Sequence, residues 1–322
     1  MDEETSWRDL LREIISDPME KQRLVDALNI NPVTLTRWVA GQSSPRQDKL
    51  QYLLKALPTH RERLSALLKR EFPYFVLDVV SQDQQPQEIP SEFYERVVRA
   101  YATGLPGQAS VVIQEMLLQQ VRDQLDGARQ GIAVFFMKCL KPREGNKVRS
   151  LCMVMGRGAT PWQNIYDNHA ALMGAEAQTG DAARGHYITI RNREERLRMY
   201  PTHYDGIAES SIAYPVQQAD RVAGCLLILS TLPDYFSPAR VDLVHAYADL
   251  ASLAFCEDEF YPLDEIQLGV MPPPSEQQPY LEKFHRRVWQ CMRQASQRNE
   301  VLRKPDAELR VWQEIEEQLL QP

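Results

Sequence analysis

The sequence lacks the features that mark several large classes of protein. It contains no run of about eighteen uninterrupted apolar residues, so no stretch is long enough to form a transmembrane helix. The N-terminal segment MDEETSWRDLL is acidic, whereas a secretory signal peptide begins with basic residues and continues with an apolar run. These absences predict a cytoplasmic protein with no membrane partner.

Cysteine is scarce and its spacing forms no motif. The five cysteines are far apart and include no C-x-x-C pair, which argues against a disulfide framework and a zinc ribbon. Four of them lie in apolar segments such as FFMKCL and AGCLLIL, where cysteine acts as a small hydrophobic residue. Because reactive thiols need an accessible, electropositive environment, we expect reduced thiols that pack in the interior: Cys139, Cys152, Cys225, Cys256 and Cys291.

Motifs of hydrolases and metalloproteases are also missing. The sequence contains no H-E-x-x-H, no G-x-S-x-G and no short Cys/His cluster. Gly156-Arg157-Gly158 is only weakly similar to a phosphate-binding loop, because Pro161 occupies the position of the third glycine of a dinucleotide-binding motif. Metal binding would require folding to bring His169, His186 and His203 together. The sequence therefore predicts no metal, no cofactor and no catalytic residue.

An enzyme would need a cluster of titratable groups, and the region from 150 to 206 is the best place to look for one. Its acidic and histidine side chains are too scattered to nominate a mechanism: Asp167, His169, Glu176, Asp181 and His186. We therefore predict that the chain is not an enzyme, with an enzyme carrying an accessory helical domain as a third alternative.

The charge is unevenly distributed along the chain. The formal net charge of −7 is unusual for a protein that binds nucleic acid. Residues 1–30 carry four basic and eight acidic side chains, whereas residues 31–70 carry eight basic side chains and only two acidic ones. A local excess of basic residues is what contact with phosphates requires. A solvated helical face is the simpler explanation for the basic residues between Lys55 and Arg70.

A chain of 322 residues exceeds what one hydrophobic core supports, so we expect two or three domains. The first seventy residues have the apolar spacing of consecutive short helices. Asp17-Pro18 and Asn31-Pro32 each combine an N-cap residue with a first-turn proline, and Asn29 is suited to end the helix before it. The helix that follows Asn31 should bury Val33 or Leu35 together with Trp38 and Val39.

The segment SQDQQPQEIPS, from Ser81, is polar and rich in Gln and Pro, which predicts a linker between domains. After it, a helix at 107–126, the strands GIAVFFMKCL, KVRSLCMVM and YITIR, and two strands joined by a tight turn at Gln218 to Arg221 alternate along the chain. A helix follows Ser237-Pro238. The proline-rich segment 271–279 cannot continue a helix and marks another boundary, and two amphipathic helices follow it, with either the protein's own sheet or a second subunit as partner.

The segment from Arg23 to Leu57 resembles the helix-turn-helix family of Cro and lambda repressor, also called the XRE family. Leu24, Ala27 and Leu28 match its first helix, Leu35 and Trp38 match the core side of its recognition helix, and Gly41 with Pro45 match the turn that follows. Val39 departs from the family, which commonly has a glutamate after the tryptophan. The resemblance implies a helix that enters the major groove of double-stranded DNA.

The expected DNA-binding residues fall into two groups. The exposed positions of the recognition helix would face base edges, because Arg pairs with guanine and Thr offers a hydroxyl and a methyl group: Asn31, Pro32, Val33, Thr34, Thr36 and Arg37. Residues beyond the helix would contact phosphate oxygens: Gln42, Ser43, Arg46 and Lys49.

Residues from about 107 to 257 resemble a GAF domain, a sensory α/β module with a central antiparallel sheet flanked by helices. Pro215, Gly224, Phe236 and Ala248 occupy the characteristic positions. The resemblance is poor over residues 156–206, which in this family build the ligand pocket, so it implies a sensor without naming what is sensed. Aromatic and methionine side chains spread through that part would line a pocket or fill a core: Met153, Met155, Trp162, Tyr166, Tyr187, Tyr200 and Tyr204.

The sequence thus predicts an α+β chain: a helix-turn-helix domain at 1–80, a linker and connecting helix at 81–106, a GAF-like sensor domain at 107–260 and a C-terminal helical extension at 261–322. The predicted function is a homodimeric transcription regulator that senses a small-molecule effector, with the dimer formed through the helix at 107–126, the helix at 239–256 or the C-terminal pair. The alternative is a protein-interaction adaptor that binds neither DNA nor a ligand.

Overall fold

The computed structural model describes residues 6–28, 30–45, 47–57, 60–72, 88–105, 107–127, 131–162, 171–203 and 206–320. Several residues singled out above therefore lie outside the described parts: Asn29, Arg46, Tyr166, Asp167, His169 and Tyr204. Most of the expected linker, residues 81–87, also lies outside them. Across the described parts, no helix combines the length and the apolar character needed to cross a bilayer.

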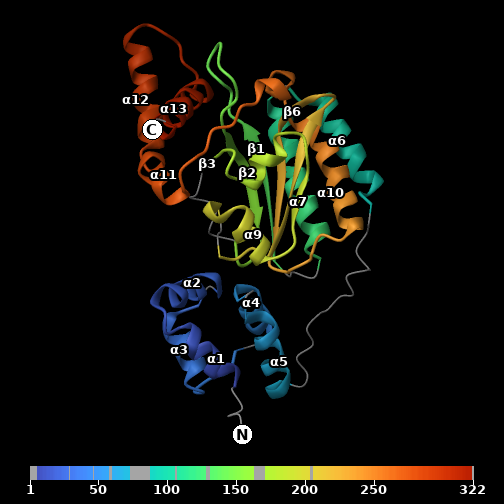
Figure 1. Ribbon diagram of the computed structural model, residues 1–322, viewed down its shortest axis with the longest axis vertical. Helices are drawn as coiled ribbons and strands as arrows, with labels where there is room; N and C mark the ends of the chain where they lie inside the picture. Colours follow the sequence, from blue (N-terminus) through green and yellow to red (C-terminus); the bar gives the residue numbers. More distant parts are fainter. Residues whose placement is uncertain are drawn as a thin grey trace.

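The N-terminal region consists of helices packed around a single core (Figure 1). The helices are α1 (Trp7–Ile14), α2 (Pro18–Leu28), α3 (Pro32–Val39), α4 (Gln47–Ala56) and α5 (Arg61–Glu71). The apolar face expected for α1 is buried, with Trp7 and Leu10 at its centre. Of the two residues of α3 expected to be alternatives for burial, Leu35 is fully buried and Val33 is 55 % exposed.

A seven-stranded antiparallel sheet forms the second region. Its strands are β1 (Ile132–Cys139), β2 (Leu151–Gly158), β3 (Leu172–Met173), β4 (Ile188–Ile190), β5 (Ser210–Gln218), β6 (Arg221–Ser230) and β7 (Tyr261–Pro262). The order across the sheet is β3-β2-β1-β6-β5-β4, with β7 pairing beside β6. This arrangement confirms the predicted fold class of a helical region followed by a GAF-like α/β domain with a central antiparallel sheet.

The two central strands are buried on both faces, which explains their almost continuous apolar sequences. In β1, Val134 and Phe136 pack into the core under the helices, whereas Phe135 and Met137 pack into a second core on the opposite face. Successive side chains of a strand point to opposite faces, so a strand covered on both sides needs apolar residues at every position. The turn between β5 and β6 lies where the sequence predicted it, and Ala219 adopts a positive φ of 54° there.

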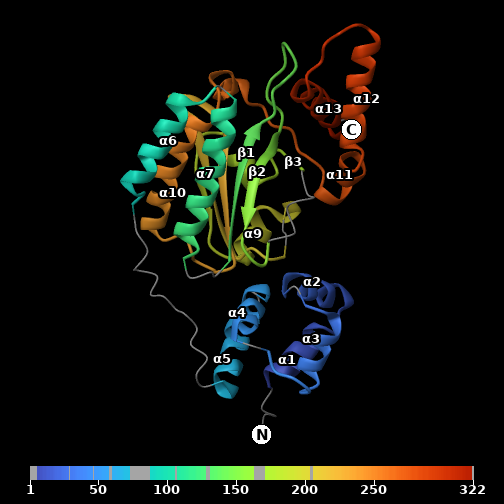
Figure 2. The same cartoon turned by 180° about the vertical axis from the view of Figure 1, so that it is seen from behind.

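Helices cover one face of the sheet (Figures 1 and 2). These are α6 (Ser91–Thr103), α7 (Gln108–Leu125) and α10 (Pro238–Ala251). α7 packs on β1 and β2, and α10 packs on β5. α6 packs against α7, and its Phe93 ring meets Tyr247 of α10 with the ring centroids 6.4 Å apart. The sequence placed α6 in the connection, but its buried Phe93 and Val97 belong to the core of the α/β domain.

Short elements cover the other face, which we call the loop-covered face. They include α8 (Gln178–Ala182), α9 (Arg193–Met199) and a 3-10 turn (Pro201–His203). After α10 the chain forms further 3-10 turns at Ser252–Ala254, Glu257–Glu259 and Leu263–Glu265.

Arg61, at the start of α5, donates a hydrogen bond to Thr231 Oγ1 at 3.2 Å, which joins the helical region to the end of β6.

The C-terminal segment forms α11 (Pro274–Leu281), α12 (Phe284–Gln297) and α13 (Lys304–Leu319). The expectation that 271–279 cannot continue a helix was wrong, because α11 begins at Pro274, where a missing backbone N–H costs nothing, and runs through Pro279. α12 and α13 bury Val288, Val311 and Ile315 against Cys152 and Leu172 of the sheet. Of the two expected partners, the protein's own sheet is therefore the one on which these helices pack.

The segment between the sheet and α11 is tied closely to the loop-covered face. A Cβ atom on Gly174 would lie 2.1 Å from the carbonyl oxygen of Gly269, so the two backbones pass in direct contact. Glu176 fastens this crossing, because its carboxylate accepts hydrogen bonds from the backbone N–H groups of Gly174 at 2.8 Å and Met271 at 2.7 Å. The chain beyond α10 is therefore part of the α/β domain up to this crossing.

Candidate functional site

Local signals at both of its ends define α3. The Asn31 side chain accepts a hydrogen bond from the backbone N–H of Val33 at 2.9 Å, and Pro32 occupies the first turn. At the other end Gly41 adopts a positive φ of 71°, and its N–H donates to the carbonyl of Trp38 at 3.1 Å. An N-cap residue, a first-turn proline and a left-handed glycine are the usual boundaries of a helix.

One face of α3 packs inward and the other is open to solvent. Leu35 and Trp38 are buried, at 0 % and 4 % exposure, and Val39 lies beside them in the core. The opposite face carries most of the residues expected to contact base edges, all of them exposed: Asn31, Pro32, Val33, Thr36 and Arg37. Thr34 is half-buried, so it lies at the margin of this face. We call this group of residues the α3 face.

The residues expected to contact phosphates differ in their surroundings. Gln42 is exposed and Ser43 half-buried, just beyond the end of α3. Lys49 instead donates a hydrogen bond from Nζ to the carbonyl oxygen of Leu28 at 2.8 Å, and it lies 5.6 Å from the centroid of the Tyr52 ring. Its ammonium group therefore closes the end of α2, next to the turn that leads into α3.

Ion pairs occupy basic side chains of α1 and α2. Arg8 pairs with Glu71 at 2.5 Å and Arg23 pairs with Glu20 at 2.6 Å. Within the described residues, Arg37 has no ion-pair partner and its side chain is exposed. Arg37 is therefore the cation on the α3 face that is available for an anionic ligand.

The residues expected to line a ligand pocket do not form one group. Met153 and Trp162 share the core of the loop-covered face, but Met155 packs into the opposite core under the helices. The cause is a bulge in β2: Phe136 pairs with Met155 and Met137 pairs with Met153, so Val154 is an extra residue between them. Two residues that would share a face in a regular strand therefore point to opposite faces.

Tyr187 also lies away from that pocket, in a column of stacked rings that the sequence analysis missed. Its ring is parallel to that of Tyr214 at 5.2 Å between centroids, and Tyr214 stacks on His245 at 4.9 Å. Asp249 lies 3.4 Å from the His245 ring nitrogen. Burial, with the nearby Asp249 carboxylate, raises the pKa of Tyr214. The three residues are far apart in sequence, so no local spacing signals the column.

The core of the loop-covered face contains several buried polar groups. Ser211 donates a hydrogen bond to Gln178 Oε1 at 2.6 Å, and Gln178 in turn donates to the carbonyl of Ile188 at 2.8 Å. The hydroxyl of Thr179 is buried and has no hydrogen-bond partner among the residues that the structure describes. A buried hydroxyl without a partner costs free energy, so Thr179 Oγ1 is a polar atom on this face that a ligand could satisfy.

The glycines of the G-R-G sequence have a packing role. A Cβ atom on Gly156 would lie 2.2 Å from the Phe135 ring, and one on Gly158 would lie 2.6 Å from Trp162. Both glycines are part of β2, where Gly156 leaves space for the Phe135 ring and Gly158 for the Cβ atom and backbone of Trp162, and they form no phosphate-binding loop.

Two of the scattered titratable residues, Glu176 and Asp181, have structural partners. Asp181 accepts a hydrogen bond from the Tyr200 hydroxyl at 2.5 Å, and Glu176 holds the crossing described above. Burial raises the pKa of Tyr200. In the described parts of the chain, no three His, Cys, Asp or Glu side chains come close enough together to hold a metal ion.

The three cysteines on the strands are buried. Burial raises the pKa of Cys139 to about 12 and that of Cys152 to about 11, and it raises the pKa of Cys225 as well. Thiols with such values are protonated at neutral pH and react slowly.

No protein-family model matches the sequence. No curated protein matches it either.

Solved structures do match, over about half of the chain. A GAF domain of an Acinetobacter phosphoenolpyruvate-protein phosphotransferase is 16% identical with a TM-score of 0.36, covering 51% of this chain and 90% of that one. A structure of Staphylococcus aureus fRMsr in complex with substrate is 16% identical with a TM-score of 0.37, covering 52% and 99%. A type II free methionine-R-sulfoxide reductase from Thermoplasma acidophilum is 15% identical with a TM-score of 0.28, covering 43% and 94%.

These matches correct one expectation. The prediction that the chain is not an enzyme was wrong, because the similar structures include a reductase. GAF-like architecture therefore does not exclude catalysis, and at these identities it assigns no activity. The chain contains a GAF-like α/β domain, preceded by a helical region whose α3 presents an open face.

Proposed function

We propose that this protein is a DNA-binding transcription regulator in which α2 and α3 form a helix-turn-helix and the GAF-like domain senses a small-molecule effector, mediates dimerisation, or both. The observation that carries the proposal is the α3 face. α3 is capped at both ends, anchored by Leu35 and Trp38, and open along the side that contains Thr36 and Arg37.

The residues of the α3 face suit the reading of base edges. The Arg37 guanidinium can donate two parallel hydrogen bonds to a guanine in the major groove. Val33 and the methyl group of Thr36 can contact a thymine methyl, since both side chains are exposed. Gln42 and Ser43 lie beyond the helix, where contacts to phosphate oxygens would fix the orientation of α3. Lys49 supports this arrangement indirectly, through the end of α2.

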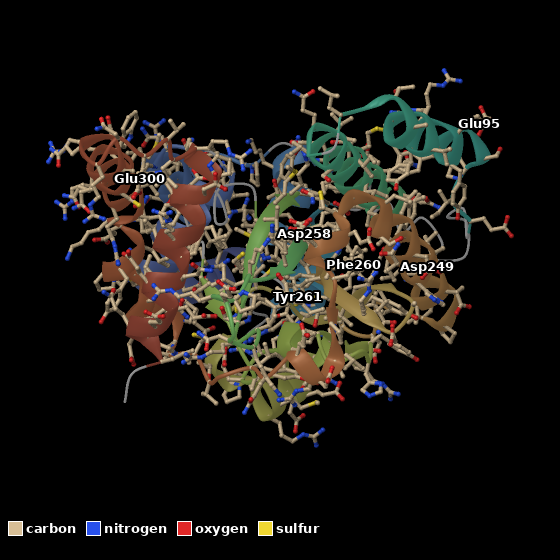
Figure 3. The ribbon with its side chains drawn as sticks, turned by 90° about the horizontal axis from the view of Figure 1, so that it is seen from above. Glu95, Asp249, Asp258, Phe260, Tyr261 and Glu300 are labelled. Carbon is tan, nitrogen blue, oxygen red and sulfur yellow. The ribbon has the colours of Figure 1, made fainter. Side chains whose placement is uncertain are left out.

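A dimer of this chain has a suitable surface on α6. Three large side chains along one side of α6 are exposed by 39–55 % and repeat at intervals of four and three residues, and a fourth, 68 % exposed, lies just beyond the end of the helix: Tyr94, Val98, Tyr101 and Leu105. This is the spacing of the seam between two paired helices. Glu95 marks the outer side of α6, at the edge of the molecule in Figure 3. We call these four residues the α6 seam.

The exposed area matches the needs of a second copy. Together with Val111 and Val112 near the start of α7, the α6 seam exposes roughly 500 Å² per copy, as much as the largest apolar patches on monomers. Doubled in a symmetric pair, this gives about 1,000 Å², which is enough for a specific interface. α6 replaces α7, α10 and the C-terminal helices as our choice for the dimer contact.

Oligomeric state tests the α6 seam. We expect the full chain to sediment as a dimer and Val98→Asp to sediment as a monomer, because the substitution buries an unpaired carboxylate in the interface. Val301→Asp, at a position that is 98 % exposed between α12 and α13, is the matched control and should leave the dimer intact. A dimer that survives Val98→Asp would contradict the assignment.

A dimer would place two α3 helices on successive major grooves, about one helical turn of DNA apart. An effector could alter DNA binding only by binding one dimer geometry more tightly than another. The proposed effector region is the loop-covered face, where Met153 and Trp162 lie together and Thr179 Oγ1 has no partner among the described residues.

Selection of duplex DNA from a random library tests the proposed function. We expect enrichment of a palindromic site, and we expect Arg37→Gln to bind that site with lower affinity and lose its base preference at one position of each half-site. Arg198→Gln on α9 removes the same charge from an exposed arginine far along the chain and serves as the control. Failure of the wild-type protein to bind duplex DNA at low salt would favour the adaptor alternative.

A further inference from the structure

The outer side of α12 carries an exposed tryptophan between two arginines. Trp289 is 72 % exposed, whereas Trp7, Trp38 and Trp162 are buried. Arg286 precedes it by three residues and Arg293 follows it by four, so all three share one side of the helix. With Gln290, Met292 and Ser296 they line an open groove of about 640 Å³. We call this surface the α12 face.

The inner side of the same helix is fully used, which leaves the outer side without a structural role. Phe284 packs on Trp312 of α13 with ring centroids 4.7 Å apart, and Val288 is 3 % exposed. Arg287 pairs with Glu314 at 2.8 Å and donates to Gln318 at 3.1 Å. Burying Trp289 is therefore not needed to hold α12 on the protein.

Positive charge is concentrated here. Residues 283–304 carry seven Lys and Arg side chains and one Glu, in a chain whose net charge is −7. Arg303 and Lys304 pair with Asp306 and Glu308. Among the described residues, Arg286 and Arg293 have no carboxylate within ion-pair distance. Positions 286 and 293 are about 10 Å apart along the helix axis, with Trp289 between them. The guanidinium groups of Arg286 and Arg293 are therefore available to bind an anion on either side of the indole.

We propose that the α12 face binds single-stranded nucleic acid, with an unpaired base stacked on Trp289 and the flanking phosphates paired with Arg286 and Arg293. Base stacking on aromatic side chains beside basic groups is the general basis of single-strand binding. An indole can stack on a base only when that base is unpaired, because bases inside a duplex already stack on their neighbours. Figure 3 shows Glu300, just beyond α12, at the opposite side of the molecule from Glu95 of α6.

The chemistry of the α12 face favours nucleic acid over a second copy of the chain. The centre of a protein interface is depleted in charged residues, as is the α6 seam. The α12 face instead has two arginines, one on either side of its exposed tryptophan, Trp289, and neither pairs with a carboxylate in the described part of the chain. A nucleic acid strand suits this face, because its phosphates can pair with the arginines and its planar bases can stack on the indole.

Fluorescence titration of the full-length protein with a twenty-nucleotide deoxythymidine strand tests the proposal. We expect quenching of the exposed indole, and Trp289→Ala should weaken binding about 5- to 150-fold, because stacking of one base is lost. Arg286→Gln combined with Arg293→Gln should reduce the slope of log affinity against log salt by about 1.4, since two phosphate contacts are removed from a single strand. Arg198→Gln again serves as the charge-matched control.

Three results would overturn the proposal. Equal affinity of the Trp289→Ala variant and the wild type would exclude stacking at this site. Loss of single-strand binding in Arg37→Gln would assign the signal to the α3 face. Dissociation of a nucleic-acid-free dimer by Trp289→Ala in sedimentation would assign the α12 face to self-association. Because Arg37 and Trp289 lie on different helices, failure here leaves the test of duplex recognition unaffected.

Discussion

Substitution of Lys49 by methionine separates two roles for this residue. The sequence suggests that Lys49 contacts a phosphate, whereas in the structure its Nζ donates to the carbonyl oxygen of Leu28 at 2.8 Å. Methionine keeps the length and much of the apolar stem of lysine but removes the charge and the donors. The experiment therefore asks whether the ammonium group acts inside the protein or on DNA.

The structure sets the size of the expected effect. A hydrogen bond from a charged donor contributes about 1.5–3 kcal/mol when buried, and Lys49 is half-buried, so we expect a loss of about 1–2 kcal/mol. This corresponds to an increase of about 5- to 30-fold in the opening equilibrium at the end of α2. Hydrogen–deuterium exchange of the peptide that contains Leu28 and Ile30 measures this directly. Exchange in α13, far along the chain, should be unchanged.

DNA binding supplies the second half of the experiment. If Lys49 acts only inside the protein, Lys49→Met should leave the slope of log affinity against log salt unchanged, whereas loss of one phosphate contact would reduce the slope by about 0.9. A reduced slope with normal exchange at Leu28 would refute the structural role. Both effects together would show that the ammonium group exchanges between the carbonyl and a phosphate.

Other substitutions test the remaining parts of the argument. Asn31→Ala should destabilise the N-terminal region by about 1 kcal/mol through loss of the N-cap, measured by exchange of the Val33 amide. Gly224→Ala should lower stability by about 1–3 kcal/mol in thermal unfolding, because the new Cβ would lie 2.0 Å from the Met137 carbonyl oxygen. Burial raises the pKa of the Glu316 carboxyl in the folded protein. The protonated carboxyl therefore contributes stability at a pH below the pKa it has in the unfolded chain, and this stability is lost as the pH rises through the folded-state pKa. Glu316→Gln, which can still accept from Ser150, should therefore raise the unfolding temperature most at pH 8 and least near pH 4; an advantage that grew toward low pH would contradict this. In the native protein, Cys139, Cys152 and Cys225 should resist a thiol reagent at pH 8 and react after unfolding, and rapid reaction before unfolding would show that the strands open.

Elements with local signals could be predicted from the sequence. The start of α3 depends on Asn31 and Pro32, and its end depends on Gly41, all within a few residues of the helix. The apolar run of β1 predicted a strand, and its burial on both faces explains the run. These signals depend on backbone conformation and nearest neighbours, so no knowledge of the remaining chain is needed.

The candidate ligand site could not be predicted, because its geometry depends on contacts between distant residues. The bulge at Val154 places Met153 and Met155 on opposite faces, and only the pairing of β2 with β1 reveals it. α6 was assigned to the connection because the contact that places it in the α/β domain, between Phe93 and Tyr247, joins residues far apart in the sequence. The column of stacked rings could not be predicted for the same reason, because it joins residues that are far apart in the sequence: Tyr187, Tyr214 and His245.

The crossing of Gly174 and Gly269 bears on how this chain can be cut and recombined. A gene fragment that ended after α10 would lack β7 beside β6, and it would also lack the backbone that Glu176 holds through Met271. Any exchange of modules would therefore have to keep residues up to Met271 with the sheet. The unit does not end at this crossing either, because Gln277 of α11 accepts from the backbone N–H of Leu172 and donates to its carbonyl, while Glu316 of α13 accepts from Ser150. The helices α11 to α13 are therefore inherited together with the sheet on which they pack.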